Sequence, residues 1–519
     1  MKIVNVAQMQ DIERRCAEEG LSTSELMDNA GLAVAKATHN WLEEVAEKRI
    51  VVLIGPGNNG GDGLVAARHL QEWGAMVFVY LAAPRAEDDV NCNLLLEKSI
   101  ICNQAAKDAK GNLLAGLLGS ANTVLDCLFG TGKSRPISGV YKRILEQVRQ
   151  AKEAHPNLQI IAVDLPSGLN ADTGEIDPAT PKCDLTITLG YPKVGMFIFP
   201  GADVLGTLAV ANIGIPPHLA QDIKLELLSE AWARSVLPPR PLNANKGSFG
   251  KAMVIGGSIN YIGAAYLACC GAIRVGAGLV TLATPQSLQP ILATKLTEVI
   301  YLPLPEAQPG VTSPEAVSQL REWIPQYDVL LIGCGLGQNQ PTTEFVQETL
   351  SSLSQKDCPA LVLDADGLNI LAKMPQWWHT LKGDVILTPH PGEMARLCGL
   401  TIEEIQSDRL GVAQQMAKRW GKIVVLKGAH TVVASPDGQV RISAVANPGL
   451  ASAGTGDVLA GVITGLLAQG LKPFEAACCG VYLHGAAADM VTGEMGDAGI
   501  IASDLLPVLP HIIKKTKGG

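Results

Sequence analysis

The sequence predicts two successive α/β domains, and three observations lead to this fold class. Apolar, strand-like segments alternate with helical stretches through most of the 519 residues, which is the pattern of a parallel sheet covered by helices on both faces. Apolar residues make up 47% of the chain and aromatic residues only 4%, so small and aliphatic side chains must fill the core. The alternation weakens between Pro216–Pro217 and Pro238–Pro239. We therefore predict a domain over residues 1–220, a linker over 221–240 and a second domain over 241–519.

Buried strands are predicted where short apolar runs are bounded by turn residues. In the first half these runs are Ile50–Ile54, Met76–Tyr80, Thr123–Asp126, Gln159–Asp164 and Leu185–Leu189. In the second half they are Lys251–Ile255, Leu279–Ala283, Val329–Ile332, Ala360–Leu363, Val385–Leu387 and Ile423–Lys427. Ligands bind beyond the carboxyl ends of the strands in open α/β sheets. We therefore expect the chemistry in the loops that directly follow these runs.

Composition and charge argue against several classes of function. A net charge of −9 at pH 7 without a basic stripe argues against a nucleic acid partner. The most apolar stretches, 262–282 and 458–471, are interrupted by Arg274 or too short to cross a membrane, and the first 15 residues lack the apolar core of a signal peptide. The 12 cysteines form no CxxC pair and are typical of buried thiols in a reducing compartment. We expect a cytoplasmic protein.

A glycine-rich loop, Gly55–Gly63, follows the first predicted strand and precedes a helix predicted over Leu64–Trp73. Glycines allow backbone amides to approach a phosphate closely at a helix N-terminus. The loop matches GxGxxG, but the next strand ends Tyr80-Leu81-Ala82-Ala83 and has no acidic residue for a ribose, so the dinucleotide-binding fingerprint fails. The segment Gly130–Ser134 resembles the end of a Walker A loop, but Cys127 stands where its first glycine should be.

Two aspartates, Asp126 and Asp164, each come at the end of an apolar strand in the first half. A turn or a helix cap would also place an aspartate there. Two of them beside one glycine-rich loop favour a binding site.

Together with Glu25–Gly31, these segments resemble the NAD(P)H-hydrate epimerases over nearly the whole first half. The resemblance implies a Rossmann-like, doubly wound parallel sheet and a potassium ion bound by Asn59, Asp126 and Ser167, whose oxygen ligands suit a hard cation. It also implies that Asp164 lies beside the nicotinamide ring as the acid/base. The residues implied in substrate binding are Asn58, Asn59, Gly60, Gly61, Asp62, Gly130, Thr131, Gly132, Lys133, Ser134, Arg135, Pro136 and Asp164.

The sharpest signal of the second half is Gly454-Thr455-Gly456-Asp457 before the apolar run 458–467. Free N–H groups at the start of a helix bind negative charge, and Asp457 could take a proton from a hydroxyl that attacks a phosphoryl group. A plain glycine-rich turn could also carry such an aspartate. Four strand-end segments favour a site: Gly333–Gly337, Asp364–Gly367, Thr388–Glu393 and Lys427–Thr431. No zinc-ligand spacing and no GxSxG nucleophile elbow is present.

With Lys246–Gly250, Gly256–Ser258 and Gly276–Val280, these segments resemble the ribokinase-like superfamily, and within it the ADP-dependent NAD(P)H-hydrate dehydratases. The resemblance implies a ribokinase-like α/β domain with Asp457 as the catalytic base. The hydrated nucleotide would contact Ala264, Gly337, His390 and Asp457. ADP would contact Lys427, Gly428, Ala429, His430, Thr431 and Gly456.

The two resemblances imply one task, the repair of hydrated NADH and NADPH. The first domain would interconvert the R and S forms. The second would transfer the β-phosphoryl of ADP to the C6 hydroxyl of the S form, releasing AMP and then phosphate as the ring is restored. Potassium is expected in the first domain and magnesium, held by the ADP phosphates largely through water, in the second. We further expect a homo-oligomer, with no nucleic acid or membrane partner.

Two other functions use the same features. A small-molecule kinase of the hydroxymethylpyrimidine or sugar type would carry the same Gly454–Asp457 turn, and product analysis with alcohols and ATP distinguishes it. A regulatory nucleotide-binding protein without turnover is a different class. The presence of Asp457, Asp164 and Lys427 argues against that second alternative.

Overall fold

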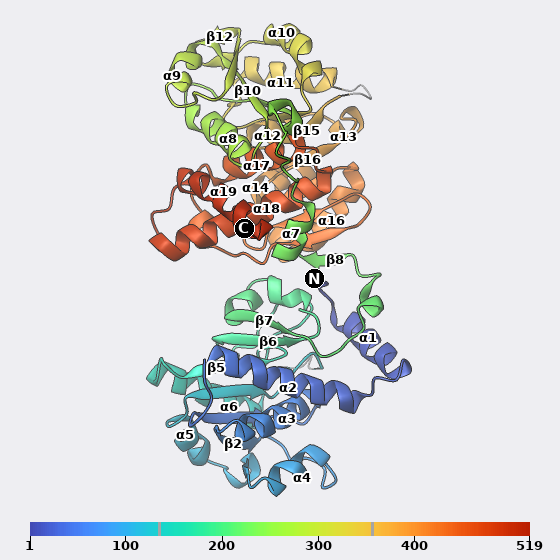
Figure 1. The fold of residues 1–519 in the computed structure, drawn as a ribbon, viewed down its shortest axis with the longest axis vertical. Coiled ribbons are helices and arrows are strands. Elements are labelled where there is room, and N and C mark those ends of the chain that lie inside the picture. The colour runs from blue at the N-terminus through green and yellow to red at the C-terminus, as the bar shows by residue number, and fades with distance from the viewer. Residues whose placement is uncertain (133–135, 354–357, 519) are drawn as a thin grey trace. The chain divides into compact units, whose positions relative to one another are not determined.

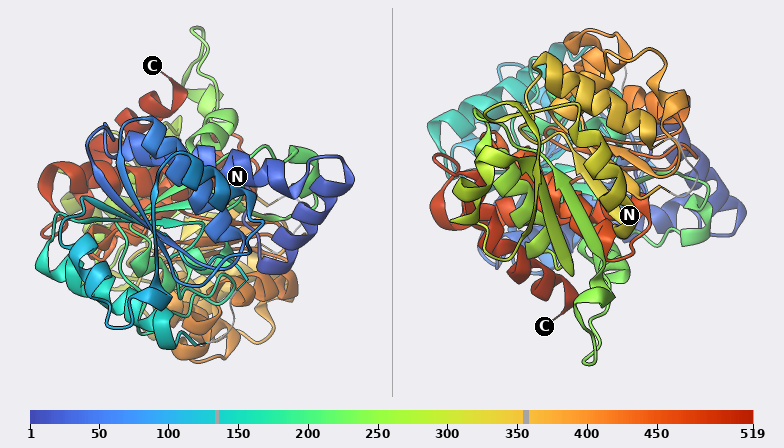
Figure 2. Two further views of the ribbon diagram at one scale, coloured as in Figure 1. Left: turned by 90° about the horizontal axis from the view of Figure 1, so that it is seen from below. Right: turned by 90° about the horizontal axis from the view of Figure 1, so that it is seen from above.

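The computed structural model describes residues 1–132, 136–353 and 358–518. The chain divides into two compact units, Met1–Ile223 and Lys224–Gly519 (Figure 1). In each unit the strands lie at the centre and helices surround them (Figure 2). Each unit is described by itself below.

The first unit is built on a seven-stranded sheet in which every neighbouring pair is parallel, in the order β3-β2-β1-β4-β5-β6-β7. All five strands predicted in this half are present. The two edge strands, β3 and β7, were not predicted, because β3 is short and half polar and β7 is only partly buried. The strands are β1 (Arg49–Ile54), β2 (Met76–Leu81), β3 (Ile101–Gln104), β4 (Thr123–Cys127), β5 (Gln159–Val163), β6 (Leu185–Leu189) and β7 (Thr207–Ala211).

Helices cover both faces of this sheet, as the doubly wound prediction requires. Alternate residues of β1 point to opposite sides: Ile50, Val52 and Ile54 belong to one hydrophobic core, and Val51 and Leu53 belong to the other. The first core includes residues of α1–α4, and the second includes residues of α5 and α6. The helices are α1 (Val6–Glu18), α2 (Thr23–Trp41), α3 (Asn58–Glu72), α4 (Val90–Glu97), α5 (Asn112–Leu118) and α6 (Gly139–Ala154).

The second unit contains a ten-stranded sheet in the order β11-β10-β9-β14-β15-β16-β17-β18-β19-β8. The strands from β11 to β17 are parallel, and β18 runs antiparallel to both of its neighbours. All six strands predicted in this half are present. The strands of this unit are β8 (Leu225–Leu227), β9 (Lys251–Ile255), β10 (Leu279–Pro285), β11 (Ile300–Leu304), β12 (Glu306–Gln308), β13 (Val311–Thr312), β14 (Val329–Ile332), β15 (Ala360–Leu363), β16 (Val385–Leu387), β17 (Ile423–Leu426), β18 (Val432–Ala434) and β19 (Val440–Ile442).

Helix α17 is almost entirely buried in the second unit and packs against α8. Glycines allow this close approach: a Cβ on Gly461 would lie 2.1 Å from the carbonyl oxygen of Ala268. The rigid packing fixes the N-terminus of α17, where Asp457 lies. The helices of the unit are α7 (Glu230–Val236), α8 (Ile262–Arg274), α9 (Gln289–Ala293), α10 (Ala316–Trp323), α11 (Gln340–Ser352), α12 (Asp366–Leu371), α13 (Trp377–Thr380), α14 (Pro391–Cys398), α15 (Ile402–Ser407), α16 (Arg409–Trp420), α17 (Thr455–Ala468), α18 (Pro473–Met495) and α19 (Ala502–Lys517).

The segment 221–240, predicted as a linker, contains ordered elements of the second unit. Strand β8 pairs with β19, and α7 packs on α18 and α19. Leu228 and Leu237, which flank α7, are buried in the core of this unit. The structure therefore differs from an open linker, because these apolar side chains need a surface against which to pack. In the described part of the chain, no helix is long and apolar enough to span a membrane.

Candidate functional site

The first unit contains a cavity of about 1120 Å³ at the carboxyl edge of its sheet. The loop after β1, the loop after β4 and the end of β5 form one side, and α1 and α2 contribute the other. The predicted substrate-binding residues that line this cavity are Asn58, Asn59, Asp62, Gly130, Thr131, Gly132 and Asp164.

The six other predicted substrate residues do not line the cavity or are not described. Helix α3 begins at Asn58, six residues before the predicted start, so Gly60 and Gly61 lie in its first turn. A Cβ on Gly60 would lie 2.2 Å from the carbonyl oxygen of Gly55, and one on Gly61 would lie 2.5 Å from Sδ of Met27. These two glycines therefore allow close packing of the helix. Lys133, Ser134 and Arg135 lie outside the described residues, and Pro136 is exposed.

Two of the three predicted potassium ligands, Asp126 and Ser167, are hydrogen-bonded to each other, and the third, Asn59, lines the cavity. The carboxylate of Asp126 accepts hydrogen bonds from the backbone N–H of Ser167 (2.9 Å) and from its hydroxyl (2.7 Å). Burial raises the pKa of Asp126, although the hydrogen bonds from Ser167 oppose this effect. Both polar atoms of the Asn59 side chain are buried without a hydrogen-bond partner among the described residues. Buried amides are normally hydrogen-bonded, so Asn59 is free to supply an oxygen ligand.

Asp164 lies at the centre of the cavity wall and forms a buried ion pair with Lys193. The Lys193 side chain is 1% exposed and also donates to the Thr188 hydroxyl and the Leu189 carbonyl, both at 3.1 Å. Asp164 has a positive φ of 65°, an uncommon conformation for a residue other than glycine. Lys193 was not predicted as a site residue. Its signal was its position four residues beyond the predicted strand that ends at Leu189.

Two further carboxyl groups face the same cavity, Glu13 of α1 and Asp62 of α3. Burial, and then the charge of Asp164, raises the pKa of Asp62 well above its usual range. The same two causes raise the pKa of Glu13. The cavity therefore combines one ammonium group with three carboxyl groups, an arrangement that can hold and move protons.

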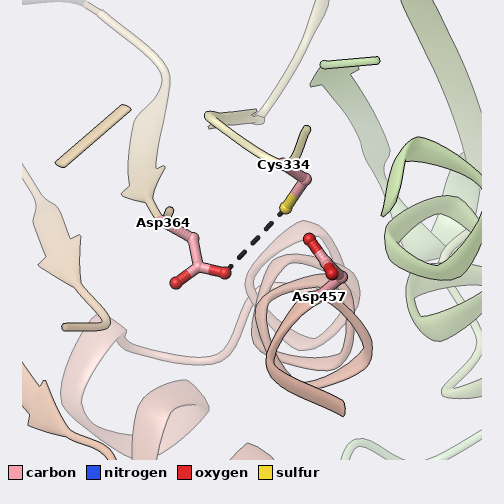
Figure 3. A group of neighbouring side chains, drawn as sticks. All are labelled: Cys334, Asp364 and Asp457. Carbon is pink, nitrogen blue, oxygen red and sulfur yellow. Dashed lines mark hydrogen bonds between the residues drawn. The ribbon is translucent and has the colours of Figure 1, made fainter. Parts of the chain in front are cut away.

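In the second unit, Asp457 lies in the first turn of α17, whose N-cap is Gly454 with a φ of 90°. Its carboxylate lies close to Asp364 and Cys334, and one ligand-type atom of each of the three lies within 4.8 Å of the others (Figure 3). Burial, and then the negative charge of Asp364, raises the pKa of Asp457 to about 6. A carboxyl group with this pKa is mostly ionised at neutral pH and can accept a proton.

Asp364, Thr388 and Lys427 come directly after β15, β16 and β17, so neighbouring strand ends bring them together. One carboxylate oxygen of Asp364 accepts from Nζ of Lys427 (2.6 Å) and from the Thr388 hydroxyl (2.7 Å). Burial lowers the pKa of Lys427, but the carboxylates of Asp364 and Glu393 outweigh it, so the net shift is upward. A Cβ on Gly456 would lie 3.2 Å from Nζ of Lys427, which places the ammonium beside the start of α17.

His390 caps α14 and forms a reciprocal pair with Glu393. Nδ1 of the His390 ring accepts from the backbone N–H of Gly392 (3.0 Å). The backbone N–H of His390 donates to the Glu393 carboxylate (2.9 Å). The ring is half-exposed, and its Nε2 lies 3.3 Å from the Glu393 carboxylate. Burial, opposed by the charge of Lys427, raises the pKa of Glu393 to about 7.

The other predicted contacts of the hydrated nucleotide lie near the strand end of β14. A Cβ on Gly335 would lie 2.8 Å from Cβ of Ala264, so the loop after β14 passes the start of α8. Gly337 has a φ of 76°, and its N–H donates to Asp366.

The predicted ADP loop, Lys427–Thr431, follows β17 as expected. Gly428 has a φ of 146°. The guanidinium of Arg409 lies next to it and donates to the carbonyls of Leu426 and Lys427. The ring of His430 is buried and its Nδ1–H donates to the carbonyl of Ser443. Gly428 and Ala429 are exposed, and Lys427 and Thr431 are partly exposed.

Another buried histidine that sequence reasoning missed supports the same helix start. Nε2 of His484 donates to the carbonyl oxygen of Thr455 at 2.9 Å, and burial lowers the pKa of His484 to about 4. It lies in the middle of the buried helix α18, where no local motif distinguishes it from a core residue.

Comparisons with known proteins match both units separately and together. Residues 252–511 match the NAD(P)H-hydrate dehydratase family, and residues 23–195 match the family described as the YjeF-related protein N-terminus. A bifunctional NAD(P)H-hydrate repair enzyme from Moorella thermoacetica is 42% identical over 99% of this chain and 97% of that protein. The chain belongs to this family. A second member, from Escherichia coli, is 35% identical over 96% of this chain and 92% of its own length.

The fold prediction is also confirmed by a solved structure. A ribokinase-like superfamily protein from Enterococcus faecalis V583 is 29% identical and superposes with a TM-score of 0.50, covering 57% of this chain and 98% of that protein. Membership in the NAD(P)H-hydrate repair family and the two α/β folds are thus established. The roles of single residues and the identities of the bound ions stay predictions.

Proposed function

We propose that this repair enzyme works in two steps, with epimerisation in the first unit and ADP-dependent dehydration in the second. Residues 1–220 would interconvert the R and S forms of hydrated NADH and NADPH, and residues 241–519 would dehydrate the S form. The observation that carries the proposal is the position of Asp457, which lies at the start of α17 beside the Lys427 ammonium. A base and positive charge are therefore placed where a phosphoryl group would be transferred.

In the dehydration step, Asp457 accepts the proton of the C6 hydroxyl of the hydrated ring. The hydroxyl oxygen forms a bond to the β-phosphorus of ADP as the bond to the α-phosphate oxygen breaks, and AMP leaves. Phosphate, a much better leaving group than hydroxide, then departs as the C6–O bond breaks, and loss of a proton from C5 to water forms the ring double bond again. The free N–H groups at the start of α17 and the Lys427 ammonium stabilise the transferring negative charge.

In the epimerisation step, Asp164 is the acid/base beside the ring, and Lys193 is its ion-pair partner. The acids Asp62 and Glu13, which line the same cavity, supply protons. The unpartnered amide of Asn59 and the oxygens of Asp126 and Ser167 fit a potassium ion. When bound, that ion would neutralise negative charge on the substrate phosphates.

The second unit offers no protein cage that suits magnesium in its described residues. The one group of three possible ligands is Cys334, Asp364 and Asp457, and a thiol is a poor ligand for a hard cation that prefers oxygen. The Lys427 ammonium already balances Asp364. Magnesium would therefore be held by the ADP phosphates and water.

The test is to incubate hydrated NADH with ADP and the full chain and to follow the absorbance of reduced nicotinamide. Absorbance should rise, and AMP and phosphate should form in equal amounts. The R form alone should be consumed only because the first unit converts it. Phosphorylation of an ordinary alcohol by ATP, without restored absorbance, would favour the small-molecule kinase instead. Cytoplasmic location, homo-oligomer formation and a preference for ADP over ATP belong to the same proposal and need separate measurements.

A further inference from the structure

Asp364 is the most enclosed charged group of the second unit's site, and neither step above assigns it a task. It is 1% exposed and lies between three groups: Lys427, Thr388 and Cys334. Figure 3 shows its carboxylate directed toward the Cys334 thiol and toward the side of the site that holds Asp457. A carboxylate this deep in the protein is costly without a partner, and its partner is the ammonium of Lys427.

We propose that Asp364 is a positioning residue for dehydration, which holds Lys427 at the start of α17 and makes Asp457 a stronger base. The inference rests on the proposed function of this site. It assigns to Asp364 no contact with the substrate or with ADP.

The first half of the proposal follows from geometry. Nζ of Lys427 lies 2.6 Å from Oδ1 of Asp364, 4.0 Å from Oε2 of Glu393, and next to Gly456. A free lysine side chain has several rotatable bonds and would sample many positions. Asp364 restricts the ammonium to one position, beside the free N–H groups of the helix start. Positive charge is then already in place when the ADP phosphates arrive.

The second half follows from charge. A second carboxylate close to Asp457 disfavours its ionised form and therefore strengthens it as a base. Lys427 acts in the opposite direction, and of these two charges that of Asp364 has the larger effect. The other titratable groups around this point are Cys334, His390, Glu393, Arg396 and His484. Two carboxyl groups with unlike surroundings thus divide the work: Asp364 stays paired with lysine, and Asp457 exchanges the proton.

The experiment measures the pH dependence of ADP-dependent dehydration of the S form with the full chain. In Asp364→Asn, the acidic limb of kcat/KM should move to lower pH by about one unit, because a like charge is removed. The KM for ADP should rise, because Lys427 is no longer held. Thr388→Val is the matched control: it removes a hydrogen bond to the same carboxylate oxygen without changing any charge, so its limb should stay in place.

Several outcomes decide the proposal. If the acidic limb of the kcat/KM profile of Asp364→Asn does not move, or moves to higher pH, the proposal is overturned, even if kcat falls. If Asp364→Asn does not fold, Asp364→Asn/Lys427→Met removes both charges of the pair and leaves none unpaired. Its limb should still lie below that of the unaltered enzyme, by less than in the single variant, and an unmoved limb again overturns the proposal. If the unaltered enzyme restores no reduced nicotinamide, the proposed function itself has failed.

Discussion

Each unit holds a buried lysine–aspartate ion pair at the carboxyl edge of its sheet, but the two pairs differ in what they face. Asp164 and Lys193 both line the cavity of the first unit. In the second unit, Asp364 pairs with Lys427 and lies close to a further carboxylate, that of Asp457. The same chemical pair can therefore meet a substrate directly in one unit and tune a separate base in the other. The difference lies in which group lines the site: Asp164 itself does so in the first unit, whereas Asp364 is 1% exposed in the second.

The comparison also explains which step needs a phosphate donor. In the first unit, proton transfer by Asp164 would allow the C6–O bond of the ring to break and to form again on the opposite face, and this inversion needs no phosphate donor. In the second unit the site must remove an oxygen from carbon, and the anion-binding start of α17 is suited to handling the phosphoryl group that makes this oxygen a leaving group.

The largest effect is expected from Asp457→Asn, which keeps the shape of the side chain but removes the base. General-base catalysis contributes roughly 10²–10⁴-fold, so dehydration of the S form should slow by about that factor. ADP affinity should change little, because Lys427–Thr431 and the helix N–H groups carry that binding. Absorbance gives the rate, calorimetry gives the affinity, and the exposed Asp497→Asn serves as a control. Near-normal turnover would refute the assignment of the base.

Lys193→Met should be next in size, because it leaves the Asp164 carboxylate buried without its counter-charge. Breaking a buried ion pair costs about 3–5 kcal/mol, so the thermal unfolding of the first unit should shift to lower temperature and epimerisation should be lost. Dehydration of the S form should persist below that transition. Lys152→Met breaks the partly exposed ion pair with Asp184 and should lower the unfolding temperature of the first unit much less.

A second variant separates stability from chemistry in this pair. Asp164→Asn/Lys193→Met removes both charges, and asparagine tolerates the positive φ at this position. The double variant should regain most of the stability without regaining epimerisation. If the Asp164→Asn/Lys193→Met variant still epimerised the substrate, the ion pair would only stabilise the fold.

Asp126→Asn should have a moderate effect, confined to the first unit. It removes the full negative charge from the proposed potassium ligands, and loss of support at a metal site commonly costs about 10–100-fold in affinity or activity. Epimerisation, followed by magnetic resonance of the R and S forms, should need more potassium chloride, while dehydration stays unchanged. Asp222→Asn, an exposed change in the same unit, is the control. Equal losses of both activities in a folded variant would contradict the ion site.

The central strands of both sheets could be predicted from the sequence because they are short apolar runs that neighbouring strands and helices bury on all sides. The edge strand β3, with Asn103 and Gln104, could not, because its polar half resembles a loop. The start of α3 was predicted too late, since glycines at 60 and 61 disfavour a helix locally and are selected here by close packing. Tertiary contacts overrode the local preference in both places.

The candidate sites divide in the same way. Asp126, Asp164 and Asp457 were predictable because each stands at a strand end or helix start beside glycines. The ion pairs were not predictable: Lys193 is 29 residues from Asp164, and Lys427, which was predicted only as an ADP contact, is 63 residues from its partner Asp364. Only the strand order of each sheet brings such residues together, and no local pattern encodes it.

The smallest expected effect concerns Glu393, the carboxyl group that links His390 to Lys427. Its pKa is raised to about 7, from 4.5, chiefly by burial, so the folded protein binds a proton here that the unfolded chain releases. Glu393 therefore contributes stability that is present below about pH 4.5 and is lost as pH rises toward 7. Glu393→Gln should remove this dependence, which amounts to about 1.4 kcal/mol for each pKa unit between the folded and unfolded values. Thermal unfolding of the second unit at pH 5 and pH 8 measures it: the variant should lose less stability than the unaltered enzyme between these values. Glu404→Gln changes the corresponding capping glutamate of α15, which is exposed, and should leave the dependence as it is. An identical pH dependence in Glu393→Gln and the unaltered enzyme would mean that Glu393 is charged in the folded state at both values, as a permanent second partner of Lys427.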